Sequence, residues 1–176
     1  GLAQHISSVV LISTDVTILT LFSSVVNVSI YSVYHNVVYG IQNLVTAFTS
    51  GLQAFLVDMY AKREDELLSE TFWQCEWIVH MLIEFAFGCT MVLLIPFIQV
   101  YTSDITDANY INKTFAVLIT LAQAAYCVRL PYNIMVMAAG HYKQTQASAI
   151  IEALINIAVS VMLVFKFGIV GVAAGT

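Results

Sequence analysis

The chain has 176 residues, of which 60% are hydrophobic and 10% are charged, and its formal net charge is −5. A typical soluble domain carries about 25% charged residues, and the mean hydropathy of this chain is +0.85. This composition excludes an ordinary soluble domain, and the few basic residues exclude the electrostatic footprint of a nucleic-acid-binding protein. We therefore predict an all-α protein whose helices cross a membrane several times.

The first predicted helix spans residues 2–22 and has one polar face. Gln4, Ser8 and Asp15 recur on that face at helical spacing. Asp15 falls near the middle of the span, where an unpaired carboxylate costs about 2.5–3.5 kcal/mol. We therefore expect Asp15 to face protein or a watery cavity and not lipid.

The second predicted helix spans residues 29–60, and no charged residue occurs between Asp15 and Asp58. At 1.5 Å per residue the helix is about 45 Å long, which exceeds the hydrocarbon core of a bilayer. A stripe of polar residues runs along it, and its members are Tyr31, His35, Gln42, Thr46, Thr49 and Gln53. Such a stripe either hydrogen-bonds neighbouring helices or lines a cavity. We favour the cavity, because six polar residues exceed what helix pairing needs.

The third predicted helix spans residues 71–101. Glu76, His80 and Glu84 stand four residues apart and therefore share one face. Glu and His at this spacing can bind a metal, but no second cluster of ligands is present. A proton- or ion-responsive face and simple pairing between helices are the other two interpretations.

The charged residues between the helices predict the topology. Segment 61–70 is the densest run of charge, expected to be a solvated loop with a short helical overhang, and its basic residues favour the cytoplasmic side. The turn 140–145 carries Lys143 and is also predicted to be cytoplasmic. The loop 102–112 is acidic, contains no Lys or Arg, and is predicted to be external.

The fourth predicted helix spans residues 113–139 and contains the most unusual pair of residues in the chain. Arg129 places a full charge inside an apolar segment, and Pro131 cannot donate the next helical hydrogen bond. The arginine must be paired or hydrated, either in an ion pair with Asp15 or Glu152 or in contact with a substrate. We favour the substrate contact, because Pro131 opens the backbone where a ligand could approach.

The fifth predicted helix spans residues 146–165 and carries Glu152, Asn156 and Ser160 at four-residue spacing. A sixth helix begins after residue 167, and its Gly171-x-x-x-Gly175 pattern predicts close helix packing. The chain then stops inside an apolar pattern, so we expect it to be an internal piece of a longer protein. The three cysteines are expected to be buried free thiols.

Six segments carry a resemblance to a known family, and they occur in family order over nearly the whole chain. They read STDVTIL at 13–19, SIYSVYHNVV at 29–38, YTSDITDANY at 101–110, RLPYNIMVMAAGHYKQTQ at 129–146, IIEALINIAVS at 150–160 and FGIVGVAAGT at 167–176. In these segments the chain resembles the bacterial polysaccharide flippases of the MATE-like (MOP) exporter superfamily. These proteins move lipid-linked oligosaccharides for O-antigen, capsule and lipopolysaccharide assembly.

The resemblance implies a two-half transporter of about twelve to fourteen helices. Residues 1–176 would be a partial transmembrane domain at the start of the second half, with about five full helices, the start of a sixth, and no soluble domain. It also implies a water-filled cavity whose cationic lining binds the pyrophosphate of the lipid carrier. Our candidate substrate or cavity residues are Arg129, Tyr31, His35, Gln42, Thr46, Gln53, Asn133 and Asn156.

The leading functional hypothesis is a flippase of the bacterial inner membrane that moves undecaprenyl-diphosphate-linked oligosaccharide outward. The resemblance suggests coupling to H⁺ or Na⁺, for which Asp15, Glu84 and Glu152 are the candidate residues. Transport changes no covalent bond, so we expect no catalytic residue, cofactor or metal. The expected partners are the lipid-linked substrate, membrane lipids, and polysaccharide polymerase and chain-length proteins, and not nucleic acid.

Other hypotheses stay open at this point. A multidrug or other small-molecule exporter of the same superfamily would use acidic and aromatic walls where a pyrophosphate carrier needs Arg and Lys. From another class, an intramembrane metal enzyme could use Glu76, His80 and Glu84. A structural membrane scaffold is the remaining alternative.

Overall fold

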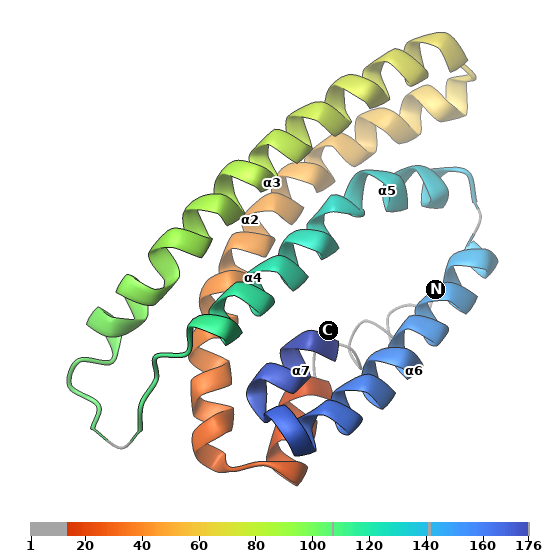
Figure 1. Cartoon of the computed structure of the whole chain (residues 1–176). Coiled ribbons are helices and arrows are strands. Elements are labelled where there is room, and N and C mark those ends of the chain that lie inside the picture. Colours follow the sequence, from red (N-terminus) through yellow and green to blue (C-terminus); the bar gives the residue numbers. More distant parts are fainter. Residues whose placement is uncertain (1–13, 107, 141, 176) are drawn as a thin grey trace.

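The computed structural model of the chain describes residues 14–106, 108–140 and 142–175 (Figure 1). Every regular element within these residues is a helix, so the predicted all-α class is confirmed. Residues 14–22 form a helix, and the earlier part of the predicted helix 2–22, with Gln4 and Ser8, lies outside the described residues. The elements that follow are α2 (Val25–Lys62), α3 (Asp65–Tyr101), α4 (Lys113–Val128), α5 (Leu130–Ala138), α6 (Tyr142–Phe167) and α7 (Ile169–Gly175).

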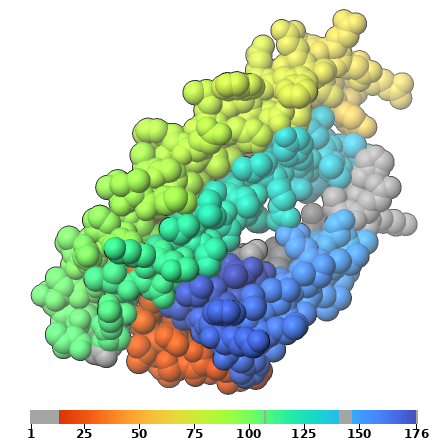
Figure 2. Space-filling model, in the orientation of Figure 1, coloured from red at the N-terminus to blue at the C-terminus, as the bar shows by residue number. Residues whose placement is uncertain are grey.

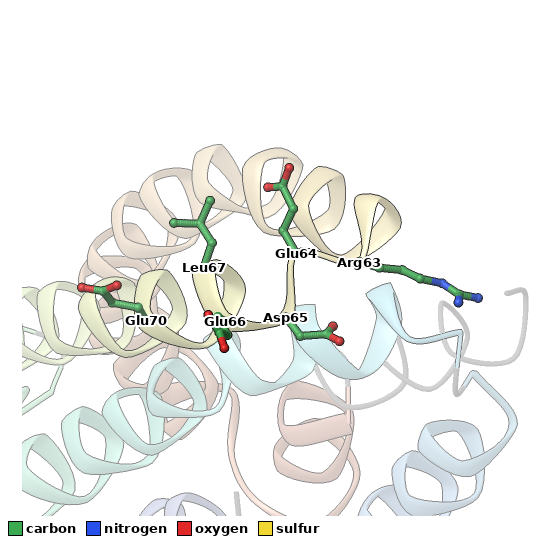
Figure 3. A pocket seen from close by; sticks show the side chains of 6 residues that line it. All are labelled: Arg63, Glu64, Asp65, Glu66, Leu67 and Glu70. Carbon is green, nitrogen blue, oxygen red and sulfur yellow. The ribbon is translucent and has the colours of Figure 1, made fainter.

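The two longest helices, α2 and α3, form an antiparallel hairpin whose tip extends past the other helices (Figures 1 and 2). The hydroxyl of Ser24 caps α2 by accepting a 3.2 Å hydrogen bond from the backbone N–H of Asn27. Arg63 ends α2 in the left-handed conformation, with φ 58°. The segment 61–70 was expected to be largely a loop, but it is mostly helical. Its charged residues spread from the tight turn at the tip (Figure 3).

The predicted helix 113–139 is divided into α4 and α5. Asn112 caps α4 by accepting a 3.0 Å hydrogen bond from the backbone N–H of Phe115. Arg129 lies between the two helices, and Pro131 stands in the first turn of α5, where its missing N–H is tolerated. The helical path continues onward into α5 (Figure 1). The division is therefore a local break in the hydrogen-bond ladder and not a reversal of the chain.

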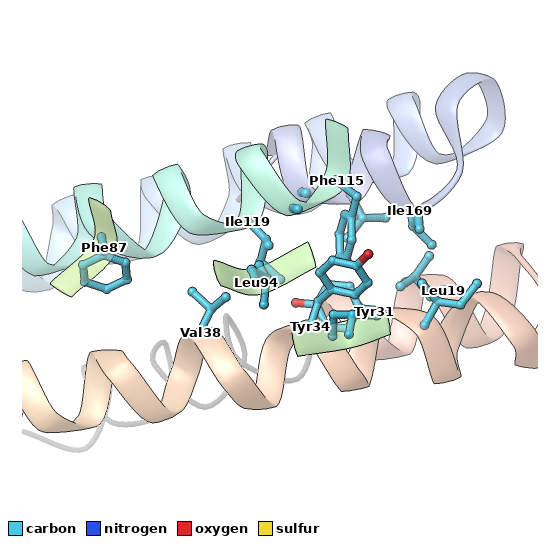
Figure 4. Packing of buried hydrophobic residues seen from close by; sticks show 14 of the residues in the cluster. Leu19, Tyr31, Tyr34, Val38, Phe87, Leu94, Phe115, Ile119 and Ile169 are labelled. Carbon is cyan, nitrogen blue, oxygen red and sulfur yellow. The ribbon is translucent and has the colours of Figure 1, made fainter. Parts of the chain in front are cut away.

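The packed core lies where α2, α3, α4 and α7 meet, together with the helix over residues 14–22 (Figure 4). Tyr34 is fully buried there, and its ring packs edge-on against Phe115 with 5.1 Å between the ring centroids. The Tyr34 hydroxyl donates to the carbonyl of Tyr110 at 2.7 Å and accepts from the backbone N–H of Asn112 at 3.0 Å. These contacts fix the end of the 102–112 loop to α2 and set the start of α4.

The helices α6 and α7 approach each other closely at small residues. A Cβ atom added at Gly171 would overlap the backbone carbonyl of Leu163, and one added at Gly175 would overlap the hydroxyl of Ser160. The side-chain amide of Asn156 donates to the carbonyl of Gly175 at 2.9 Å. The packing face predicted at Gly171 and Gly175 is therefore confirmed, and it joins α7 to α6.

Within the residues that the structure describes, four helical segments are long and apolar enough to cross a membrane, over residues 25–62, 65–101, 113–138 and 147–167. No more than 33% of the residues in the apolar window of any of them are buried. The remaining apolar side chains need lipid or further protein around them. The hairpin tip and the turn at Gly140 lie at one end of the molecule, and the 102–112 loop lies at the other (Figure 1). This arrangement agrees with the prediction that the segments 61–70 and 140–145 lie on one side of the membrane and the loop 102–112 on the other. Which side is cytoplasmic stays a prediction.

Candidate functional site

The break between α4 and α5 places Arg129 opposite Glu152 of α6. The guanidinium Nη1 lies 2.7 Å from the carboxylate Oε1, and the two side chains are 49% and 44% exposed. The Arg129 guanidinium also lies 5.8 Å from the ring centroid of Tyr126, within range of a cation–π contact. Glu152 was one of the two acids predicted as partners of this arginine. The half-exposed pair leaves guanidinium surface open to water or a ligand.

The other predicted partner, Asp15, lies elsewhere in the interior. It is 3% exposed, and its Oδ2 accepts a 2.8 Å hydrogen bond from the hydroxyl of Tyr31. The Tyr31 ring stacks on His35, and His35 stacks on Tyr39, with centroid distances of 5.4 and 5.3 Å. Three rings on successive turns of α2 thus form a continuous column that begins at a buried carboxylate.

Tyr39 was missed by the sequence analysis, although the signal was present. The predicted stripe jumps seven residues from His35 to Gln42, and Tyr39 divides that interval into four and three. A tyrosine in an apolar run reads as a hydrophobic residue, and its role in the column depends on ring contacts that spacing alone does not reveal.

The rest of the α2 stripe is divided between the interior and the surface. Gln42 and Thr49 are buried, and Thr49 donates to the carbonyl of Val45 in its own helix at 2.8 Å. Thr46 and Gln53 are half-buried. The buried members therefore face packed protein, whereas Thr46 and Gln53 keep contact with the surroundings.

The predicted face of Glu76, His80 and Glu84 on α3 is also divided. Glu76 is 9% exposed and accepts a hydrogen bond from the hydroxyl of Tyr132 on α5. The His80 ring lies 6.4 Å from the Tyr132 ring, while Glu84 is exposed. Among the residues that the structure describes, no group of three or more His, Cys, Asp or Glu could hold a metal ion. Glu76 therefore pairs two helices, which was one of the three interpretations.

The two asparagines predicted to line the cavity have different surroundings. Asn133 is exposed on α5. Asn156 is 5% exposed and binds α7 through Gly175, so it holds two helices together. In the face shown in Figure 2, a gap separates α5 from α6, and the pair of Arg129 and Glu152 joins α6 to the junction of α4 and α5.

No protein-family model, no curated protein and no solved structure matches this chain.

Proposed function

We propose that this chain belongs to a transporter that moves an undecaprenyl-diphosphate-linked oligosaccharide across the bacterial inner membrane, coupled to H⁺ or Na⁺. The observation that carries the proposal is the position of Arg129. It lies within an apolar span, at a break in the helix, with about half of its side chain exposed beside Glu152. A charge at such a depth is expensive to maintain, and in membrane proteins it marks a pathway for substrates or ions.

The chemistry of arginine supports an anionic substrate. Its planar guanidinium offers five donors in a fixed fork that matches phosphate or carboxylate oxygens. Glu152 occupies part of this fork, so a diphosphate would contact the exposed remainder or exchange with the carboxylate. Either arrangement needs no covalent chemistry, and alternating access to the two sides of the membrane is sufficient.

The test is transport of a fluorescent lipid-linked oligosaccharide in proteoliposomes. We expect Arg129→Ala to abolish transport in a folded protein. Arg129→Lys should retain folding but lower transport by at least about tenfold, because the charge remains while the two-pronged geometry is lost. Lys62→Ala is the matched control, since Lys62 is an exposed cation paired with Asp58 within one helix. Normal transport by well-folded Arg129→Ala would contradict the proposal.

A drug exporter of the same superfamily is the second candidate, and a specific observation favours it. The column of Tyr31, His35 and Tyr39, which begins at the buried carboxylate of Asp15, brings together the acidic and aromatic side chains that an organic-cation site uses. Efflux of a cationic dye separates the two functions. Dye efflux that depends on Asp15 and Tyr31 but not on Arg129 would favour the exporter over the flippase.

A further inference from the structure

A groove of about 380 Å³ lies between α3 and α5, and Tyr132 in its wall is three residues from Arg129. Its walls are mostly apolar or aromatic, and they are formed by Leu68, Ser69 and Phe72 of α3 and by Tyr132, Met135 and Val136 of α5. We call this feature the α3–α5 groove. Its size falls within the range of about 300–1,000 Å³ that is typical of binding sites. The transport proposal assigns it no role.

The walls of the groove are held in place by contacts beneath them. The hydroxyl of Tyr132 donates to Glu76, which is 9% exposed, and the Tyr132 ring packs edge-on against Phe72 with 5.9 Å between centroids. Behind them, Leu68 and Ile134 belong to a buried cluster that α2 completes. A groove whose walls are already ordered loses little conformational entropy when it is filled.

The groove begins at the tip of the α2–α3 hairpin, and the length of α2 would carry this tip beyond a bilayer. With 38 residues, α2 is about 57 Å long at 1.5 Å per residue, against a full bilayer thickness of about 40–45 Å. The charge-free stretch of the hairpin lies toward the start of α2, because no charged residue precedes Asp58 in that helix. The excess length therefore extends into water at the charged end, and the α3–α5 groove opens beside it.

The groove adjoins an acidic surface at the hairpin tip, which we call the acidic rim. Among the described residues, Asp65 is the one carboxylate that lines the groove itself. It also lines the neighbouring surface of the tip, together with Arg63, Glu64, Glu66 and Glu70 (Figure 3). Between residues 58 and 70 there are five carboxylates and two cations, and one cation, Lys62, is engaged by Asp58 at 2.7 Å. An anionic lipid surface would be repelled here. The charge is complementary to Lys and Arg.

We propose that the α3–α5 groove docks a basic amphipathic segment of a partner protein at the membrane surface. The apolar face of that segment lies in the groove, and its Lys or Arg residues face Asp65 and the acidic rim beside it. The apolar groove supplies most of the buried area, and the acidic rim sets the orientation and the charge preference. This interaction goes beyond the proposed transport and does not depend on it.

The test uses the whole chain in nanodiscs of neutral phosphatidylcholine and a fluorescent Leu/Lys peptide of about 14 residues, roughly four helical turns. Fluorescence anisotropy should show that the peptide binds discs that contain the chain (filled discs) much more tightly than discs without it (empty discs). A scrambled peptide of the same composition and a Leu/Glu analogue should bind at least about tenfold more weakly. Raising the salt concentration should weaken binding, because the rim is exposed.

Two groups of variants locate the contact. Val136→Trp or Ser69→Trp should fill the groove and weaken peptide binding at least about tenfold. Val92→Trp is the matched control, because Val92 is 73% exposed on α3 and does not line the groove. The triple variant Asp65→Asn, Glu66→Gln, Glu70→Gln should weaken binding and reduce its salt dependence, whereas Asp58→Asn should not.

Three results would overturn the proposal. The first is that the Leu/Lys peptide binds equally well to filled and to empty discs. The second is unchanged binding in both Val136→Trp and Ser69→Trp, with thermal unfolding like that of Val92→Trp to establish that the variants are folded. The third is a phospholipid that co-purifies with the chain, disappears from the mass spectrum in Val136→Trp, and excludes the peptide from the native groove.

Discussion

Two of the contacts that α6 makes with its neighbours differ in kind. Against α7, backbones approach so closely that neither Gly171 nor Gly175 has room for a Cβ atom. Toward α5, a gap is visible, and one half-exposed ion pair between Arg129 and Glu152 joins the helices (Figure 2). Close backbone packing resists displacement, whereas a solvated ion pair can exchange partners with little cost. We therefore infer that the close contact with α7 holds α6 more firmly than the ion pair with Arg129 does.

The largest effect is expected at the close contact. Gly171→Ala places a methyl group against the carbonyl of Leu163, which belongs to the backbone and cannot turn aside. We expect it to destabilise the folded protein by about 1–3 kcal/mol, the usual range for overpacking. Thermal unfolding of the purified chain in detergent measures the change.

Gly51→Ala is the control for that substitution, because nothing lies within 4 Å of the added Cβ on the exposed surface of α2. In the middle of a helix, alanine is more stabilising than glycine by about 0.5–1 kcal/mol. The same chemical change should therefore stabilise the chain at residue 51 and destabilise it at residue 171. Equal effects at the two glycines would contradict the close contact between α6 and α7.

An intermediate effect is expected at the ion pair. Glu152→Gln leaves Arg129 without its counter-charge, and because both side chains are only half exposed we expect a loss of about 1–2 kcal/mol. Asp58→Asn breaks the other 2.7 Å pair, Lys62–Asp58, whose side chains are each 59% exposed. That change should stay within about 0.5 kcal/mol.

Reversing the charges separates a pair interaction from damage at either site. The combined Arg129→Glu and Glu152→Arg variant should recover at least half of the stability that Glu152→Gln loses, since a pair can form again across the gap. No recovery, or a loss no larger than that of Asp58→Asn, would show that the pair does not hold α6.

The sequence predicted the helices well because apolar runs longer than a bilayer crossing admit few alternatives. It misjudged the segment 61–70, where the density of charge suggested a loop. Glu, Lys and Leu are good helix formers, and the acidic residues favour the first turn of α3, so the helices continue to within two residues of each other.

The candidate site was predicted only in part. Spacing identified Arg129, Glu152 and Asp15 as residues that need partners, but it could not choose the partners. Tyr132 illustrates the limit, since its contact with Glu76 joins residues 56 apart on different helices. Periodicity describes one helix at a time, and a contact between helices depends on how each is rotated against the other.

The smallest effect on stability is expected from substituted cysteines on residues predicted to line a cavity. Their reaction rates report whether water reaches those residues. In a chain whose three native cysteines are replaced, Asn133→Cys and Thr46→Cys should react with a small polar thiol reagent. Asn156→Cys and Thr49→Cys should react at least about tenfold more slowly, because their side chains are buried and must wait for local opening. Thr46 and Thr49 are matched in type and lie one helical turn apart, so their ratio reports burial and not chemistry. Fast reaction at all four positions would mean that water also reaches Thr49 on α2 and the α6–α7 contact at Asn156. Slow reaction at all four would mean that none of these residues lines a hydrated cavity.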